Sequence, residues 1–256
     1  MARVEYFVES ALHEGGGMPA VPYCGPAPLP GAAAGAWNFD PPLLAALALA
    51  AWLLSHQPRA SWAGLGLLAL AYVSPICALS SGLFSVRAAH HLLVVYAAAP
   101  LLAGQFVRLP ADLSKVPLSA ALVLHVAVMW AWHVPLAYSW ALSSDLAYWL
   151  GQVALLGSAM LFWYRLADTA TSLPAALLAI IAMTMQMGLL GALLTFAPGA
   201  LYAPHYLTTG LYGLTPLADQ QLAGLLMWTA SLPLTVLAGY SAVSRLLHGL
   251  RAEPVS

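Results

Sequence analysis

The chain alternates long apolar runs with short polar connections, a pattern typical of a protein that crosses a membrane several times. The runs at residues 63–85 and 173–218 contain no charged side chain at all. Most runs approach the roughly 20 residues that a helix needs to cross a bilayer core. The pattern predicts seven spans, at residues 41–55, 63–80, 88–106, 118–137, 146–164, 173–196 and 220–240.

Composition supports the same interpretation. Hydrophobic residues make up 62% of the 256 residues and charged residues only 7%, whereas ordinary soluble domains carry about 25% charged residues. This excludes a soluble globule, and eight scattered basic residues disfavour nucleic-acid binding. Because most connections are short, we expect an all-α bundle of about seven antiparallel transmembrane helices in the lipid bilayer.

The placement of the basic residues predicts the orientation of the bundle. Six of the eight fall on one side of the expected spans (Arg59, Arg108, Lys115, Arg165, Arg245 and Arg251), and two fall on the other (Arg3 and Arg87). By the positive-inside rule, the N-terminus lies outside and the C-terminus in the cytoplasm. We expect an external irregular tail at residues 1–36 without a cleavable signal peptide, a membrane domain at 37–245 and a cytoplasmic tail at 246–256.

Both cysteines fall on the expected external side, Cys24 in the tail and Cys77 near the outer end of the second span. That side is oxidising in this orientation, so the two thiols could form a disulfide or bind a metal. The alternative is two unpaired thiols, with Cys77 packed between helices.

Metal-capable side chains gather in the fourth expected span. His125, Met129 and His133 lie four residues apart, so a helix places them in one stripe. Imidazole and thioether groups are ligands that copper favours. Two more histidines, His90 and His91, open the third expected span, and antiparallel neighbours would bring them to the depth of His133.

The stripe also has simpler interpretations. His125 could form a hydrogen bond to a neighbouring helix, and Met129 could fill the core. Met183 and Met187 of the sixth span share one face, but they lie deeper and are weaker candidates.

Polar residues on the outer side could support a metal site. Asp219 lies at the mouth of the seventh span, beside Gln220 and Gln221, and its carboxylate could orient a ligating histidine. Arg87 could reach lipid phosphates or pair with an aspartate, and it would repel a cation placed directly beside it. The long connection at residues 197–219 is a candidate lid, partner surface or interfacial belt.

Several ordered motifs resemble the CtaG-like cytochrome c oxidase assembly factors, from about Pro41 to the seventh span. The motifs are Phe84-Ser85, His91-Leu92-Leu93, Ala98-Ala99-Pro100-Leu101-Leu102, Trp132-His133-Val134-Pro135 with Tyr138, Leu161-Phe162-Trp163, Leu194 to Phe196, Leu201-Tyr202 with Tyr206, and residues 219–228 starting Asp219-Gln220-Gln221. The resemblance implies a multi-pass protein of the bacterial inner membrane that helps to build a haem-copper oxidase and handles its copper.

The chain also departs from the family pattern at three positions. Members of the family commonly have histidine where Arg87 and Gln152 stand, and glutamine where His90 stands. The resemblance therefore carries over His91, His133 and Asp219. It leaves His90 and His125 as possible replacements for the missing imidazoles.

These observations predict an assembly factor, not an enzyme, that binds copper, with Cu(I) favoured, at its outer face. It would pass the metal to an oxidase subunit or a copper chaperone, or hold that subunit while the metal enters. The alternatives are a copper transporter, a haem-binding membrane redox protein and a scaffold without metal. No nucleophile motif, phosphate-binding loop or metalloprotease helix indicates catalysis.

Overall fold

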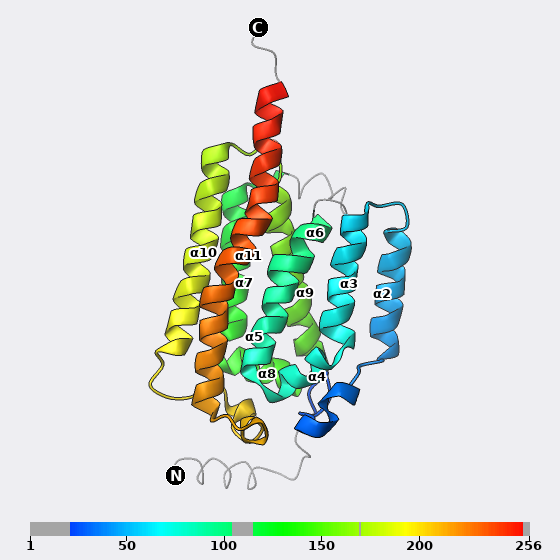
Figure 1. Ribbon diagram of the computed structural model, residues 1–256, viewed down its shortest axis with the longest axis vertical. Coiled ribbons are helices and arrows are strands. Elements are labelled where there is room, and N and C mark those ends of the chain that lie inside the picture. Colours follow the sequence, from blue (N-terminus) through cyan, green and yellow to red (C-terminus); the bar gives the residue numbers. More distant parts are fainter. Residues whose placement is uncertain (1–20, 104–114, 169, 253–256) are drawn as a thin grey trace.

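A computed structural model describes residues 21–103, 115–168 and 170–252, and within these ranges all regular structure is helical (Figure 1). The expected all-α fold is therefore confirmed. The helices run side by side in one bundle, with α2 at one edge and α10 at the other. Their bounds are α2 Pro41–Leu53, α3 Arg59–Val73, α4 Pro75–Gly82, α5 Phe84–Leu92, α6 Ala99–Ala103, α7 Leu118–His133, α8 Pro135–Ser143, α9 Asp145–Leu166, α10 Leu173–Thr195 and α11 Pro216–Ala252.

Short helical turns complete the described part, namely η1 Pro30–Gly35, η2 Leu93–Ala98, η4 Ala203–His205 and η5 Thr209–Tyr212. Some expected features lie outside the described residues: residues 1–20 of the external tail, the end of the third span at Phe106, residues 253–256, Arg3 and Arg108.

Membrane character is visible in three described helices that are long and apolar enough to cross a bilayer: Phe84–Ala103, Asp145–Leu166 and Leu173–Thr195. Two bent pairs, α3 with α4 and α7 with α8, raise this to as many as five crossings. The expected number of seven and the placement of the two termini on opposite sides of a membrane stay predictions.

Two of the expected spans, 63–80 and 118–137, are broken by a proline. The axis bends by 49° where α3 meets α4 at Pro75, and by 75° where α7 meets α8 at Pro135. Proline lacks an amide N–H and forces the preceding residue out of helical geometry, and the residue before each proline is indeed extended. Each of these two spans is therefore interrupted by a bend, and α7 ends at His133, directly before Val134 and Pro135.

The third expected span, 88–106, also differs, because α5 begins four residues earlier, at Phe84. After α5 the helix widens into the π-helical turn η2 before it continues as α6. The indole Nε1 of Trp163 on α9 donates a hydrogen bond of 2.7 Å to the Val95 carbonyl in this turn. This hydrogen bond from a neighbouring helix stabilises the irregular backbone, because no water is available inside a membrane to bond its polar groups.

Helices α10 and α11 approach each other through glycine. A Cβ atom on Gly191 would lie 2.6 Å from the Gly224 carbonyl oxygen, and a Cβ on Gly224 would lie 2.5 Å from the Gly191 carbonyl oxygen. Only glycine fits at both positions, a device common between membrane helices. The opposite face of α10 carries exposed apolar side chains, namely Leu178, Ile181, Met185, Leu189 and Leu193.

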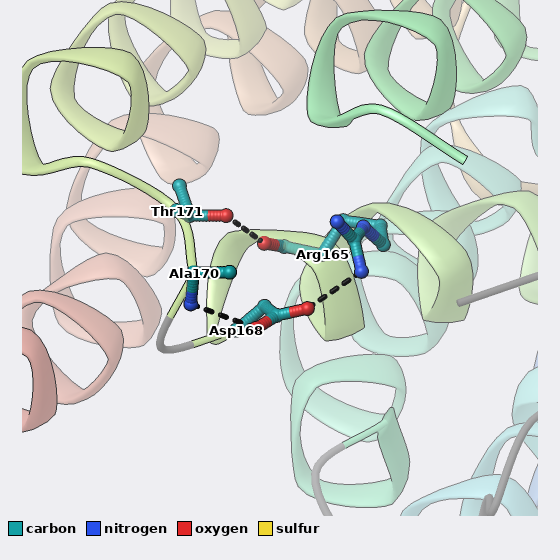
Figure 2. A network of polar contacts seen from close by, with 4 residues as sticks. All are labelled: Arg165, Asp168, Ala170 and Thr171. Atoms are coloured by element: carbon teal, nitrogen blue, oxygen red, sulfur yellow. Dashed lines mark hydrogen bonds and ion pairs between the residues drawn. The ribbon is translucent and has the colours of Figure 1, made fainter. Parts of the chain in front are cut away.

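The turn between α9 and α10 is closed by a polar network (Figure 2). Arg165 Nη1 lies 2.6 Å from Asp168 Oδ2, and the other oxygen of Asp168 accepts from the Ala170 amide. The Thr171 hydroxyl donates to the Arg165 carbonyl at the end of α9. This network satisfies carbonyl and amide groups that the end of a helix leaves unpaired.

Cys24 and Cys77 form a disulfide, which decides between the alternatives left open by the sequence. The bond ties the segment before η1 to the first turn of α4, where both cysteines are buried against Tyr72 and Tyr148. Disulfides persist in oxidising compartments. The bond therefore favours an external location for this end of the bundle. It also attaches the described part of the expected tail to α4.

We expect Cys24→Ser to lower the free energy of unfolding by about 2–4 kcal/mol, because the disulfide restricts the unfolded chain. Thermal unfolding of the purified protein in detergent measures the loss, and the variant and the wild type should unfold alike in reductant. Two reactive thiols in unreduced, denatured wild type would contradict the bond.

Candidate functional site

The predicted stripe is the buried face of α7. The buried residues of this helix are Ala121, His125, Met129 and His133, spaced by four throughout. The stripe thus faces the interior of the bundle and not lipid. Its three metal-capable members nevertheless have different surroundings.

His133 faces His91 of α5 across a small cavity. The two imidazole rings stand nearly perpendicular, with their centroids 5.9 Å apart. The cavity has a volume of about 20 Å³, enough for one water-sized species. Its walls come from α5, α7, α8 and α9, and its polar lining residues are Arg87, His91, His133, Tyr138, Tyr148 and Gln152.

The tautomer of His133 is fixed by the backbone. Its Nδ1 lies 2.7 Å from the Met129 carbonyl oxygen, which can only accept, so Nδ1 carries the proton and donates. In the neutral ring Nε2 then has a free lone pair. His91 has no hydrogen-bond partner on either ring nitrogen among the described residues, although it is buried. Both rings can therefore present a nitrogen to a ligand.

Arg87 of α5 is buried beside the cavity, with only 3% of its surface exposed. Its Nε donates to the Ser80 carbonyl at 3.2 Å, and its guanidinium lies 5.6 Å from the Tyr138 ring centroid and 5.7 Å from that of Tyr148. Aromatic faces attract such a cation. Arg87 therefore does not extend to lipid phosphates, and it forms no ion pair with any acidic residue that the structure describes.

His90 does not line the cavity, although Arg87 and His91 of the same helix do. Its ring packs edge-on against Tyr72, with centroids 4.9 Å apart, and it lines a separate, mostly apolar groove of about 470 Å³ between α3, α4, α5 and α11. Consecutive helical residues differ by about 100° in direction. His90 and His91 therefore face different surroundings.

Asp219, in the first turn of α11, caps the start of α5. It is fully buried, and its carboxylate accepts hydrogen bonds from the Phe84 amide at 2.6 Å, the Ser85 amide at 3.2 Å and the Ser85 hydroxyl. A carboxylate stabilises the positive end of a helix. This contact explains why α5 begins earlier than expected, and it places Arg87, His90 and His91 inside the helix. Asp219 thus holds α5 and makes no hydrogen bond to His91 or His133.

The connection before α11 contacts residues of the site. Gln220 accepts from the Leu201 amide and donates to the Leu194 carbonyl. The Tyr202 hydroxyl donates to the His133 carbonyl at 2.9 Å. Gln221 is half-buried and is not among the cavity residues. The connection is therefore anchored to α7 and α10, but none of its residues lines the cavity.

His125 and Met129 are not brought to the cavity. His125 Nδ1 lies 2.9 Å from the Ser158 hydroxyl of α9, the interhelical hydrogen bond considered as an alternative. Met129 is packed in the main hydrophobic core together with Met183 and Met187. Among the residues that the structure describes, no three His, Cys, Asp or Glu side chains gather as a metal-binding group. The cavity offers a pair of imidazoles.

Sequence reasoning missed three aromatic partners of the site. Tyr138 and Tyr148 flank Arg87, and Tyr72 donates to Gln152 Oε1 at 2.9 Å. His205 was also missed, and its Nε2 lies 2.6 Å from the Tyr138 hydroxyl. These residues come from separate segments with no common spacing. Only the Tyr138 position, five residues beyond His133 in a family-like motif, gave a signal.

A family model described as cytochrome c oxidase caa3 assembly factor matches residues 43–248. No curated protein matches the chain, and no solved structure matches it. The matched range includes every residue that lines the cavity.

We expect Asp219→Asn to destabilise the fold by about 1–3 kcal/mol, because the amide cannot accept all the hydrogen bonds that start α5. Denaturant unfolding in detergent measures this. The control is Asp145→Asn, which changes an exposed carboxylate in the first turn of α9 and should have little effect. Equal stability of both variants would show that the Asp219 carboxylate is not what holds α5.

We also expect His205 to make stability fall as the pH drops below about 6.5. Burial lowers the pKa of His205 to about 3, with Arg87 acting in the same direction, whereas an unfolded histidine has a pKa of about 6.5. Between these values the unfolded chain binds the extra proton, so stability decreases by up to about 1.4 kcal/mol per pH unit. Unfolding midpoints measured against pH should show a shallower slope for His205→Gln and an unchanged slope for His56→Gln, an exposed control. An unchanged slope in His205→Gln would contradict this assignment.

Proposed function

The chain belongs to the cytochrome c oxidase caa3 assembly factors, and from this premise we propose that it binds copper at the His91/His133 cavity and supports its delivery to an oxidase subunit. The observation that carries the proposal is the pair of facing imidazoles, each with a nitrogen free for a ligand. Imidazole is a ligand that suits copper. The proposal needs no catalytic step.

The ring geometry fits a shared ion. A metal–imidazole bond is about 2.0–2.1 Å long and a ring nitrogen lies about 1.1 Å from its ring centroid, so two imidazoles that bind one ion have centroids no more than about 6.3 Å apart. The observed separation is 5.9 Å. His133 also has the second interaction typical of a metal-bound histidine, since its other ring nitrogen donates to a backbone carbonyl. This interaction orients Nε2 before any ion arrives.

The surroundings of the pair favour transient binding. The buried guanidinium of Arg87 lines the same cavity and opposes a second cation. A site of two neutral ligands beside a fixed positive charge holds copper less tightly than a site with three histidines. Weak holding suits a protein that must pass its metal on.

Two alternative functions receive less support. A copper transporter needs a path of ligands through the membrane, but His125 is bonded to Ser158 and Met129 is enclosed in the core. A haem protein needs a far larger space, because cofactor pockets span about 300 Å³ or more and this cavity measures about 20 Å³. The cavity size favours a single ion.

Transfer to a partner would proceed at the end of the bundle where α5 begins and α7 ends. Figure 1 shows that α4, α8 and η1 gather at the same end. The connection carrying Tyr202 and His205 contacts His133 and Tyr138 at this end, so an oxidase subunit or a copper chaperone that docks here would meet this connection.

We expect the double substitution His91→Ala with His133→Ala to lower Cu(I) affinity more than about 100-fold, because it removes both ligands. Purified protein in detergent would be reduced, loaded with Cu(I) and titrated with a chromophoric Cu(I) chelator, with metal analysis giving the stoichiometry.

The matched control for this experiment is His56→Ala, an exposed histidine between α2 and α3, which should bind copper like the wild type. Thermal unfolding verifies that all three proteins are folded. Unchanged copper affinity in the double variant, or no bound copper in the wild type, would refute the proposed site.

A further inference from the structure

Arg87 presents a buried positive charge that no described residue neutralises. Only 3% of the residue is exposed, and its Nη2 has no hydrogen-bond partner in the part of the chain that the structure describes. A buried charge is costly unless an opposite charge or a full set of hydrogen bonds compensates for it. The two tyrosine faces and the Ser80 carbonyl offer only partial compensation.

The nearby acidic groups do not serve as a counter-ion. Asp219 is buried, but its oxygens accept hydrogen bonds from Phe84 and Ser85, and it forms no ion pair with Arg87. Asp145, at the start of α9, is exposed. Within the described ranges, Arg87 therefore has no carboxylate partner, and a negative charge from outside the chain would complete the site.

The cavity beside Arg87 has the size and the donors for such a charge. Its volume of about 20 Å³ admits one water-sized ion. Gln152 lines it, and because the Oε1 atom of Gln152 accepts from the Tyr72 hydroxyl, its side-chain amide remains available to donate. His91 lines the same space with two unpartnered ring nitrogens, one of which carries a proton in the neutral ring.

We propose that the copper-free protein binds one small monovalent anion of halide size in this cavity, held by the Arg87 guanidinium and the Gln152 amide. The anion neutralises the buried cation and stabilises the packing of α5 against α8 and α9. The anion site rests on Arg87 and Gln152 and does not depend on the proposed copper function.

The test compares thermal unfolding of the copper-free, detergent-purified protein in sodium chloride and in sodium gluconate of equal ionic strength. Gluconate is too large for the cavity, so only chloride can fill it. We expect chloride to raise the midpoint saturably, by about 4 °C at roughly ten times its dissociation constant. Arg87→Gln should remove the difference between the salts. Arg59→Gln, which changes an exposed arginine of α3, should retain it.

A second measurement works even if Arg87→Gln fails to fold. Crystals of the wild type soaked in sodium bromide should show an anomalous peak within hydrogen-bond distance of the Arg87 guanidinium. Equal midpoints in the two salts, a chloride effect that persists in Arg87→Gln, or bromide found only elsewhere would each overturn the proposal. All these measurements are made without copper, so a failure of copper binding would leave their outcome unaffected.

Discussion

The hydrogen bonds between the Asp219 carboxylate and the first turn of α5 are the contact on which the rest of the site depends. Asp219 opens α11, while Phe84 and Ser85 open α5, so the contact joins segments about 135 residues apart in sequence. It stabilises the positive end of α5 with a buried negative charge. It thereby sets where α5 begins, and hence the depth of Arg87 and His91.

A second constraint comes from Pro135, which ends α7 directly after His133. The bend sends α8 across the end of the bundle, where Tyr138 meets both Arg87 and His205. The walls of the cavity come from α5, α7, α8 and α9, and its polar lining side chains are buried. Electrostatic interactions are stronger inside a protein than in water. A single arginine among its walls therefore has a large effect on which ions can enter.

Much of the fold was predictable because the constraints that act on a membrane helix are local. Helices lie at each position where a run of apolar residues predicted one. The spacing of His125, Met129 and His133 predicted the buried face of α7. The pairing of His91 with His133 also followed, since antiparallel neighbours share depth. The roles of Asp219 and Arg87 did not follow, because a capping bond or a missing counter-ion depends on segments that meet only in the folded chain.

The sequence by itself determined an all-α membrane bundle, a buried stripe on one helix and membership of an assembly-factor family, because hydrophobic periodicity and ordered motifs are written along the chain. Only the tertiary structure decided that His90 and His91 face different surroundings, that His125 bonds to Ser158, and that Cys24 pairs with Cys77. These outcomes depend on the rotation and depth of each helix relative to its neighbours. Packing fixes those two quantities, and no pattern within a single segment contains them.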